Sequence, residues 1–255
     1  MSSMFDLKGR VVVITGAGQG IGRAYAHAFA AAGALPVIAE LNAAAGEHVA
    51  AEILAQGGQA EAIATDVSDV DSVNALVHTV VARHGRLDIL VNNAAIFSTI
   101  TMRPFTEIPL DEWDRVMRVN ITGTFLMTRA VVPNMQARQW GRVINISSAA
   151  VTMGRPNYLH YTTSKAAVIG MTRSMARELG PHGITVNAVL PGATDTEIER
   201  ATVTPQQKTA MLAMRCVQRE ETPTDLVGTV LFLASDASAF VSGQSITVDG
   251  GLTFL

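Results

Sequence analysis

Short runs of aliphatic and β-branched residues alternate with longer segments of helical period in this chain of 255 residues, and this alternation constrains the fold most. Brief apolar runs are typical of buried strands, whereas apolar residues at i, i+3, i+4 and i+7 are typical of helices. Strands separated by helices build parallel sheets through right-handed crossovers. We therefore predict an α/β protein: a single-domain Rossmann fold with a doubly wound, seven-stranded parallel sheet and helices on both faces. The expected strands are residues 11–15, 35–39, 60–65, 87–92, 142–146, 184–190 and 245–248.

The expected helices cover residues 20–32, 43–56, 70–84, 110–139, 158–179 and 223–233. Ser68, with Asp71 three residues later, predicts an N-cap for the third helix, and Thr222-Pro223-Thr224-Asp225 predicts one for the last. No linker, repeat or low-complexity stretch divides the chain, so we expect residues 1–255 to form a single domain.

Composition excludes several classes of function. A formal charge of -3 and a pI near 6.1 provide no basic field for nucleic acid. The longest apolar stretch, residues 28–39, is interrupted by Gly33 and Pro36 and is shorter than the roughly 18 residues of a membrane span. The six histidines are scattered, and Cys216 is the only cysteine. We expect a cytoplasmic protein with no nucleic-acid or membrane partner, no disulfide and no metal.

A glycine-rich turn, Thr15-Gly16-Ala17-Gly18-Gln19-Gly20-Ile21-Gly22, joins the first expected strand to the first helix. Backbone N–H groups and the positive helix end make such a junction a receptor for a pyrophosphate. The spacing is T-G-x-x-x-G-x-G and differs from the general fingerprint G-x-G-x-x-G. The alternative interpretation is a tight connection with no ligand.

Glu40 stands at the end of the second expected strand, where a dinucleotide site places an acid on the ribose. A carboxylate there repels a 2′-phosphate, and neither Gln19 nor Leu41 supplies a compensating cation. The pattern predicts NAD rather than NADP. Arg23, one residue past Gly22, is the main competing feature, either as a phosphate ligand or as part of a solvated helix face.

Tyr161 and Lys165 lie four residues apart on an expected helix, so their side chains share one face, and Ser148 lies thirteen residues before Tyr161. A free phenol has a pKa of about 10 and is a poor base at neutral pH. A nearby ammonium favours the phenolate, so this pair beside a dinucleotide suggests hydride-transfer chemistry. An ordinary helix pair is the alternative.

Together these residues resemble the short-chain dehydrogenase/reductase family, and the likeness covers nearly the whole chain. Its hallmarks here are the T-G-x-x-x-G-x-G turn, Asn92-Asn93-Ala94-Ala95 with alanine in place of the usual final glycine, and the Y-x-x-x-K of Tyr161. The resemblance implies a catalytic tetrad of Asn120, Ser148, Tyr161 and Lys165, with Asn120 holding a water for proton relay. Ser147 and Tyr158 are the competing serine and tyrosine.

The family pattern also implies the cofactor site and the assembly. Asp66-Val67 resembles the adenine-binding pair, Pro191-Gly192 the segment against the nicotinamide, and Thr194 and Thr196 the groups on its carboxamide. Homotetramers are common in the family, and we expect the apolar tail 252–255 to be buried in a subunit contact. The full expected cofactor set is Gly16, Gln19, Gly20, Ile21, Gly22, Glu40, Asp66, Val67, Asn93, Tyr161, Lys165, Pro191, Gly192, Thr194 and Thr196.

The expected activity is hydride transfer between NAD(H) and a secondary alcohol or ketone, with Tyr161 as general acid/base. Residues 1–255 are thus expected to form a single dinucleotide-binding catalytic domain, with residues 193–218 as its substrate-side lid. Residues 94–97, 149–155 and 193–218 are expected to surround this small-molecule substrate. Met211 and its apolar neighbours are either substrate wall or core, and Arg155 or Arg103 is either an acid-binding group or a solvated surface residue. Two alternatives remain: an NADPH-dependent 3-oxoacyl thioester reductase and a non-catalytic NAD-binding regulator.

Overall fold

The computed structural model describes residues 5–198 and 205–254. The described strands form one sheet, in which every neighbouring pair is parallel and the order is β3-β2-β1-β4-β5-β6-β7. The predicted fold class is therefore confirmed. The strands are β1 (Val11–Thr15), β2 (Leu35–Glu40), β3 (Glu61–Ala64), β4 (Ile89–Asn92), β5 (Gly141–Ile146), β6 (Ile184–Pro191) and β7 (Ser245–Val248).

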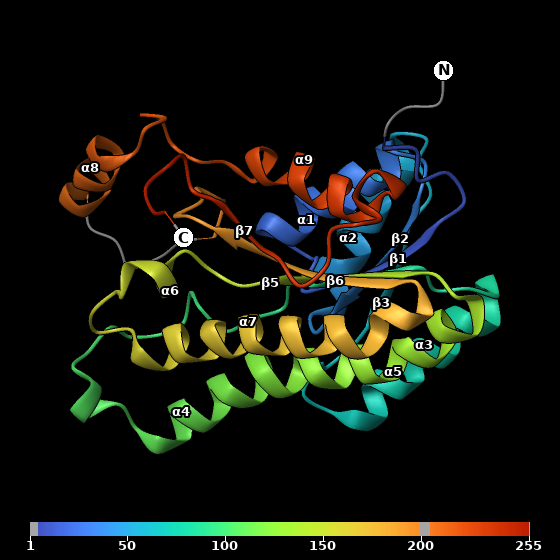
Figure 1. The fold of residues 1–255 in the computed structure, drawn as a ribbon, viewed down its shortest axis with the longest axis horizontal. Coiled ribbons are helices and arrows are strands. Elements are labelled where there is room, and N and C mark those ends of the chain that lie inside the picture. Colours follow the sequence, from blue (N-terminus) through green and yellow to red (C-terminus); the bar gives the residue numbers. More distant parts are fainter. Residues whose placement is uncertain (1–4, 199–204, 255) are drawn as a thin grey trace.

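Helices cover both faces of this sheet (Figure 1). On one face lie α1 (Gly20–Ala31), α2 (Ala43–Ala55) and α9 (Pro223–Ala234), and on the other α3 (Val70–His84), α4 (Leu110–Met117), α5 (Thr124–Arg138) and α7 (Leu159–Leu179). Each layer has its own core, one including Tyr25 and Phe29 and the other Leu76 and Met127. None of the described helices is both long and apolar enough to cross a membrane.

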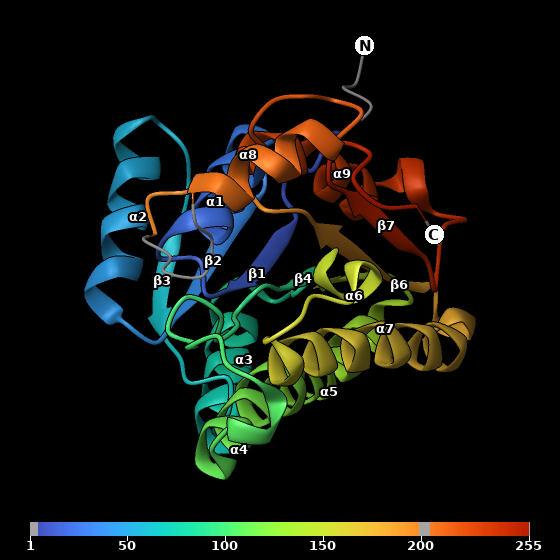
Figure 2. The same cartoon turned by 90° about the vertical axis from the view of Figure 1, so that its left-hand side faces the viewer.

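The crossover from one face to the other positions the site. β1 pairs with β2 on one side and β4 on the other, and the helices that follow β1 and β4 pack on opposite faces. A crevice opens beyond the carboxyl ends of the strands at such a switch point. Two further helices, α6 (Ala150–Met153) and α8 (Pro205–Met214), lie at this end of the sheet (Figures 1 and 2).

The expected helix 110–139 is present, since the backbone stays helical from Leu110 to Arg138, but its hydrogen-bond pattern changes in the middle. A π-helical segment, Arg118–Gly123, separates α4 from α5. Within it the Asn120 carbonyl accepts a 2.9 Å hydrogen bond from Thr124 Oγ1. Hydroxyl bonds to the preceding turn compete with the regular ladder and bend helices. The segment places Asn120 in the interior.

One predicted cap is corrected and another is confirmed. Asp69, not Ser68, is the N-cap of α3, because the Ser68 hydroxyl donates to Asp66 Oδ1 instead, at 2.7 Å. At α9 the capping box is present, and the Asp225 carboxylate accepts the Thr222 N–H at 2.8 Å.

Candidate active site

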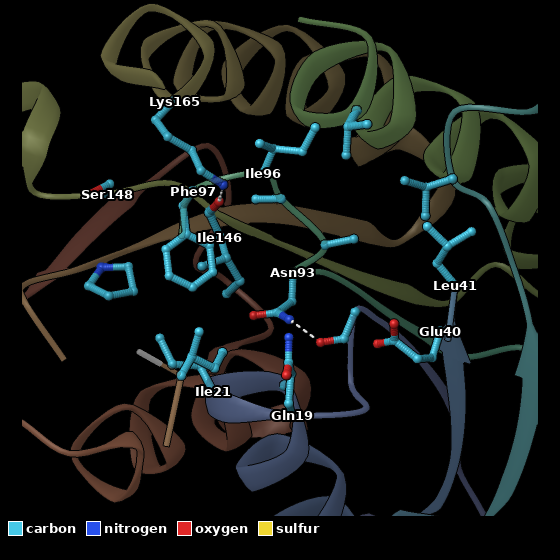
Figure 3. Close-up of a pocket in the computed structure, with 18 of the residues that line it drawn as sticks. Gln19, Ile21, Glu40, Leu41, Asn93, Ile96, Phe97, Ile146, Ser148 and Lys165 are labelled. Atoms are coloured by element: carbon cyan, nitrogen blue, oxygen red, sulfur yellow. Dashed lines mark hydrogen bonds between the residues drawn. The ribbon is translucent and has the colours of Figure 1, made fainter. Parts of the chain in front are cut away.

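A cavity of about 430 Å³ lies beyond the carboxyl ends of the strands (Figure 3). Its size falls within the range of about 300–1,000 Å³ that is usual for small-molecule and cofactor sites. Its walls come from every part of the sheet edge between β2 and β6. They contain all the predicted cofactor residues except Gly20, and all the predicted catalytic residues except Asn120.

The glycine-rich turn packs too tightly for side chains. Gly16 has a φ of +62°, and a Cβ added there would lie 2.8 Å from the Ala94 Cα. A Cβ on Gly22 would collide with the Gly16 carbonyl oxygen. Asn93 closes the turn by donating from Nδ2 to the carbonyl oxygens of Thr15 and Gly16, at 3.0 and 2.9 Å. The cradle therefore presents bare backbone to the cavity.

A side-chain carboxylate of the chain itself accepts a hydrogen bond from one backbone N–H of this turn. Glu197 accepts a 2.8 Å hydrogen bond through Oε1 from the N–H of Gly20, the first residue of α1. Gly20 is thus engaged with a side chain outside the turn, and it is not part of the cavity wall. The contact shows that the amino end of α1 holds a negatively charged oxygen, which is the chemistry that a pyrophosphate requires. The residues present therefore fit a dinucleotide.

Glu40 lines the cavity next to the glycine-rich turn. Its Oε2 accepts the N–H of Gly18 at 3.0 Å and its Oε1 the N–H of Asn42 at 3.1 Å. Two backbone donors hold the carboxylate against the glycine-rich turn. Arg23 points elsewhere and pairs with Glu52 through two hydrogen bonds, of 2.8 and 2.6 Å. That pairing raises the pKa of Arg23 and, with His27, lowers the pKa of Glu52 to about 2.

At the reactive end, Lys165 is almost fully buried, with 4% of its surface exposed. Its Nζ donates to the Ile146 carbonyl oxygen at 2.8 Å and lies 5.7 Å from the centroid of the Tyr161 ring. Burial lowers the pKa of Lys165 from 10.5 to about 8. The ammonium is therefore still mainly protonated at neutral pH, and Lys165 lines the cavity together with Tyr161.

The two serines differ in their partners. Ser147 is 2% exposed, and its hydroxyl donates to the Lys165 carbonyl oxygen at 2.7 Å. Ser148 is half-buried, its Oγ accepts the Ala150 N–H at 3.1 Å, and it lines both the main cavity and a neighbouring one of about 70 Å³. Ser147 is thus used in tying β5 to α7, whereas Ser148 faces both cavities.

Asn120 lies behind the wall and is 1% exposed. Its Oδ1 accepts the Ile96 N–H at 2.8 Å, and its Nδ2 donates to the Ile96 carbonyl and to Ser164 Oγ, at 3.2 and 3.0 Å. The side chain therefore fixes the wall residue Ile96 to helix α7.

The smaller cavity lies on the expected substrate side. Its walls are largely apolar and include Phe97, Met153 and Met211. Arg155 also lines it, with its guanidinium 5.1 Å from the Tyr158 ring, whereas Arg103 pairs with Glu112 at 3.3 Å. Of the two arginines considered from the sequence, Arg155 is the one at the cavity.

Some wall residues were not predicted individually from the sequence. Arg115 from α4 and Ile198 line the main cavity. Arg115 is remote from every motif, whereas Ile198 lies in the expected lid, two residues after Thr196. Glu197 was also missed, although its place four residues after Ala193 in the expected lid marked the region. Among residues 5–198 and 205–254, no group of three or more His, Cys, Asp or Glu side chains is arranged to hold a metal ion.

Comparisons with known proteins agree with this geometry. The profile of a family described as Enoyl-(Acyl carrier protein) reductase matches residues 16–253. A 3-oxoacyl-[acyl-carrier-protein] reductase from Synechocystis is 41% identical, covering 98% of this chain and 99% of its own. A D-threitol dehydrogenase from Mycolicibacterium smegmatis is 35% identical, covering 98% and 95%.

Solved structures give the same result. A protein from Sinorhizobium meliloti assigned as a short-chain alcohol dehydrogenase has a TM-score of 0.92 at 33% identity, over 98% of each chain. One from Beutenbergia cavernae assigned as an NAD(P)-dependent gluconate 5-dehydrogenase, with NADP bound at low occupancy, has a TM-score of 0.90 at 38% identity, over 98% and 99%. The chain belongs to the short-chain dehydrogenase/reductase family of oxidoreductases, whose members use a nicotinamide cofactor.

Proposed function

We propose that this protein is an NAD-dependent dehydrogenase that transfers hydride between NAD(H) and a secondary alcohol or ketone. The observation that carries the proposal is the buried Lys165 ammonium 5.7 Å from the centroid of the Tyr161 ring, with Ser148 in the wall of the same cavity. A buried cation next to a phenol in a cleft is an arrangement that enzymes use to make a base. A binding module has no need of it.

In the proposed reaction the Tyr161 oxygen accepts the hydroxyl proton of the alcohol, and ketone reduction returns it. Lys165, protonated below a pH of about 8, stabilises the phenolate that accepts this proton. Ser148 holds the substrate oxygen. Bound NAD supplies the acceptor for the hydride that leaves the substrate carbon.

For Asn120 we propose a positioning role. Both polar atoms of its side chain bond to protein groups, Ile96 and Ser164, so its contribution passes through the wall that Ile96 forms. The water relay to Lys165 that the family resemblance implies stays a prediction, since Asn120 Oδ1 retains a second lone pair that can accept from a water.

We further propose NAD as the cofactor, because Glu40 is anchored by the N–H groups of Gly18 and Asn42. A 2′-phosphate would have to displace an anchored carboxylate or be repelled by it. The Beutenbergia protein holds NADP in its structure, so the choice between NAD and NADP has to be measured for this chain.

A second candidate is a 3-oxoacyl thioester reductase, which the Synechocystis relative favours. The apolar wall of Phe97, Met153 and Met211 suits an acyl chain as well as an alkyl or aryl alcohol. Residues 193–218, described over 193–198 and 205–218, form the proposed substrate-side lid, and Ala193 and Met211 line the smaller cavity.

We also propose a homotetramer. Phe254, in the apolar tail, is 83% exposed in the single chain, and Phe240 is fully exposed. Exposed aromatics of this kind mark contacts between subunits. Light scattering on the purified protein tests this, and a monomer contradicts it.

Absorbance at 340 nm tests the proposed function with a panel of alkyl, aryl and polyhydroxy secondary alcohols, each with NAD and with NADP. A panel of 3-oxoacyl thioesters is read in parallel with NADH and NADPH. We expect turnover of an alcohol with NAD. Turnover of thioesters with NADPH alone supports the reductase, and dinucleotide binding without turnover on either panel supports a regulator.

A further inference from the structure

Arg215 and Glu221 form a buried ion pair next to residues 192–195, and Gly192 and Thr194 of this segment line the main cavity. Glu221 and Arg215 are 5% and 4% exposed, and Arg215 Nη2 lies 3.4 Å from Glu221 Oε2. A buried pair adds little net stability, because desolvation opposes the attraction. Its presence beside a cavity therefore calls for another explanation.

Glu221 is joined directly to the residues that follow β6. Thr194 Oγ1 donates to Glu221 Oε1 at 2.7 Å, and the Asp195 N–H donates to the Glu221 carbonyl oxygen at 2.6 Å. The fit is close, since a Cβ added at Gly192 would collide with Glu221 Oε2. Residues 192–195 are thus held against this carboxylate by side chain and backbone together.

Arg215 holds the same segment from the other side. Its Nη2 donates to the Ala193 carbonyl oxygen at 3.2 Å, and its Nη1 donates to the Arg219 carbonyl oxygen at 3.0 Å. Arg215 directly follows α8, whose Met211 lines the smaller cavity. The ion pair therefore connects the substrate-side helix with the cavity wall.

The Glu221 carboxylate also determines whether the Thr194 hydroxyl donates or accepts, because it takes the hydroxyl proton in a hydrogen bond. Burial raises the pKa of Glu221, while the bond from Thr194 and the charge of Arg215 oppose the rise. A hydroxyl that gives its proton to a carboxylate presents only lone pairs to other partners. Thr194, a wall residue of the main cavity, is then an acceptor there.

We propose that Glu221, held by Arg215, is a positioning residue that fixes residues 192–195 and makes Thr194 an acceptor for a carboxamide N–H of the cofactor. This inference rests on the proposed function. It adds a residue that does not touch the cavity contents and that acts through Thr194.

Calorimetric titration with two reduced dinucleotides provides the test. NADH carries a carboxamide N–H, whereas the acetylpyridine analogue has a methyl group in its place. We expect wild type to bind NADH at least fivefold more tightly than the analogue. Glu221→Gln, whose amide can donate to Thr194, and Thr194→Val are each expected to reduce this ratio below twofold.

A control separates positioning from general damage to the loop. Arg219 lies in the loop between Arg215 and Glu221 and forms an exposed ion pair with Asp225 of α9. Arg219→Gln removes that pair and is expected to leave the ratio of the two dinucleotide affinities unchanged. A wild-type ratio in Glu221→Gln overturns the inference. If that variant does not fold, a wild-type ratio in Thr194→Val overturns it equally. Wild type that binds neither dinucleotide rejects the proposed function itself.

Discussion

The ring of Tyr158 lies against the ring of Tyr161, with centroids 4.6 Å apart and planes inclined by 32°. Tyr158 is 3% exposed, and its hydroxyl donates to the Phe97 carbonyl oxygen at 3.0 Å. The Arg155 guanidinium lies 5.1 Å from the centroid of the Tyr158 ring and Lys165 Nζ 5.7 Å from that of Tyr161, so each phenol has a cation near its ring. The tyrosine outside the proposed tetrad thus holds the proposed base in place.

Replacing Tyr158 tests this support. Tyr158→Leu removes ring packing worth about 0.5–1.5 kcal/mol, and we expect kcat to fall about tenfold, since about 1.4 kcal/mol corresponds to that factor. Tyr158→Phe keeps the ring and is expected to retain kcat within threefold. The KM for NAD changes little in either variant. Steady-state kinetics give both constants, and an undiminished kcat in the leucine variant contradicts the supporting role.

Replacing Glu40 tests cofactor choice. Glu40→Ser removes the anchored carboxylate, and we expect the ratio of kcat/KM for NAD to that for NADP to fall at least tenfold, because the repulsion of a 2′-phosphate is lost. Glu47→Gln, an exposed acid on α2, is the matched control. A ratio that stays at the wild-type value in the serine variant removes Glu40 from cofactor selection.

The buried Lys165 predicts a dependence of stability on pH. With a folded pKa of about 8 against 10.5 for the free side chain, the unfolded chain binds a proton that the folded chain lacks between these values. Stability then rises with pH across this window, by up to about 1.4 kcal/mol per unit. Lys165→Met lacks this increment. Urea unfolding of both proteins at a series of pH values measures it, and parallel curves contradict the burial of a titrating ammonium.

Replacing Asp88 is expected to lower the free energy of unfolding without weakening the binding of NADH. Asp88 is 1% exposed, precedes β4 at the end of the sheet opposite the cavity, and accepts the Val11 N–H and two bonds from Arg86. Asp88→Asn removes the buried carboxylate that accepts these bonds, at a cost of about 1–3 kcal/mol. Denaturant titration and NADH titration check the two halves of the prediction. Asp114→Asn, an exposed acid, is the control, and a weakened affinity for NADH in Asp88→Asn contradicts the separation.

Local signals predicted the framework well. The strands were visible because parallel strands buried on both faces read as continuous apolar runs, and the cap at Thr222 was visible because its acid lies in the same turn. The π-helical segment Arg118–Gly123 was not visible in the sequence, since π-helical segments have no distinct periodicity. The choice of Asp69 over Ser68 depended on Asp66, a partner in the preceding loop.

The residues of the candidate site also fall into a group that local sequence spacing predicts and a group that it does not. Residues that meet through a strand end, a turn or one helix face, such as Glu40, Tyr161 and Lys165, were predictable from spacing. Glu197 and the pair of Arg215 with Glu221 were not, because their partners are brought to them by the tertiary fold. A buried carboxylate in a polar stretch of sequence reads as an ordinary surface acid.

The most direct test of the account is Tyr161→Phe, measured for NADH affinity by titration and for turnover at 340 nm with the best substrate of the panel. The variant loses one hydroxyl and keeps the ring against Tyr158, so we expect the Kd for NADH to stay within threefold of wild type. Turnover is expected to fall at least a thousandfold. Turnover at the wild-type rate contradicts the assignment of Tyr161 as the group that moves the proton.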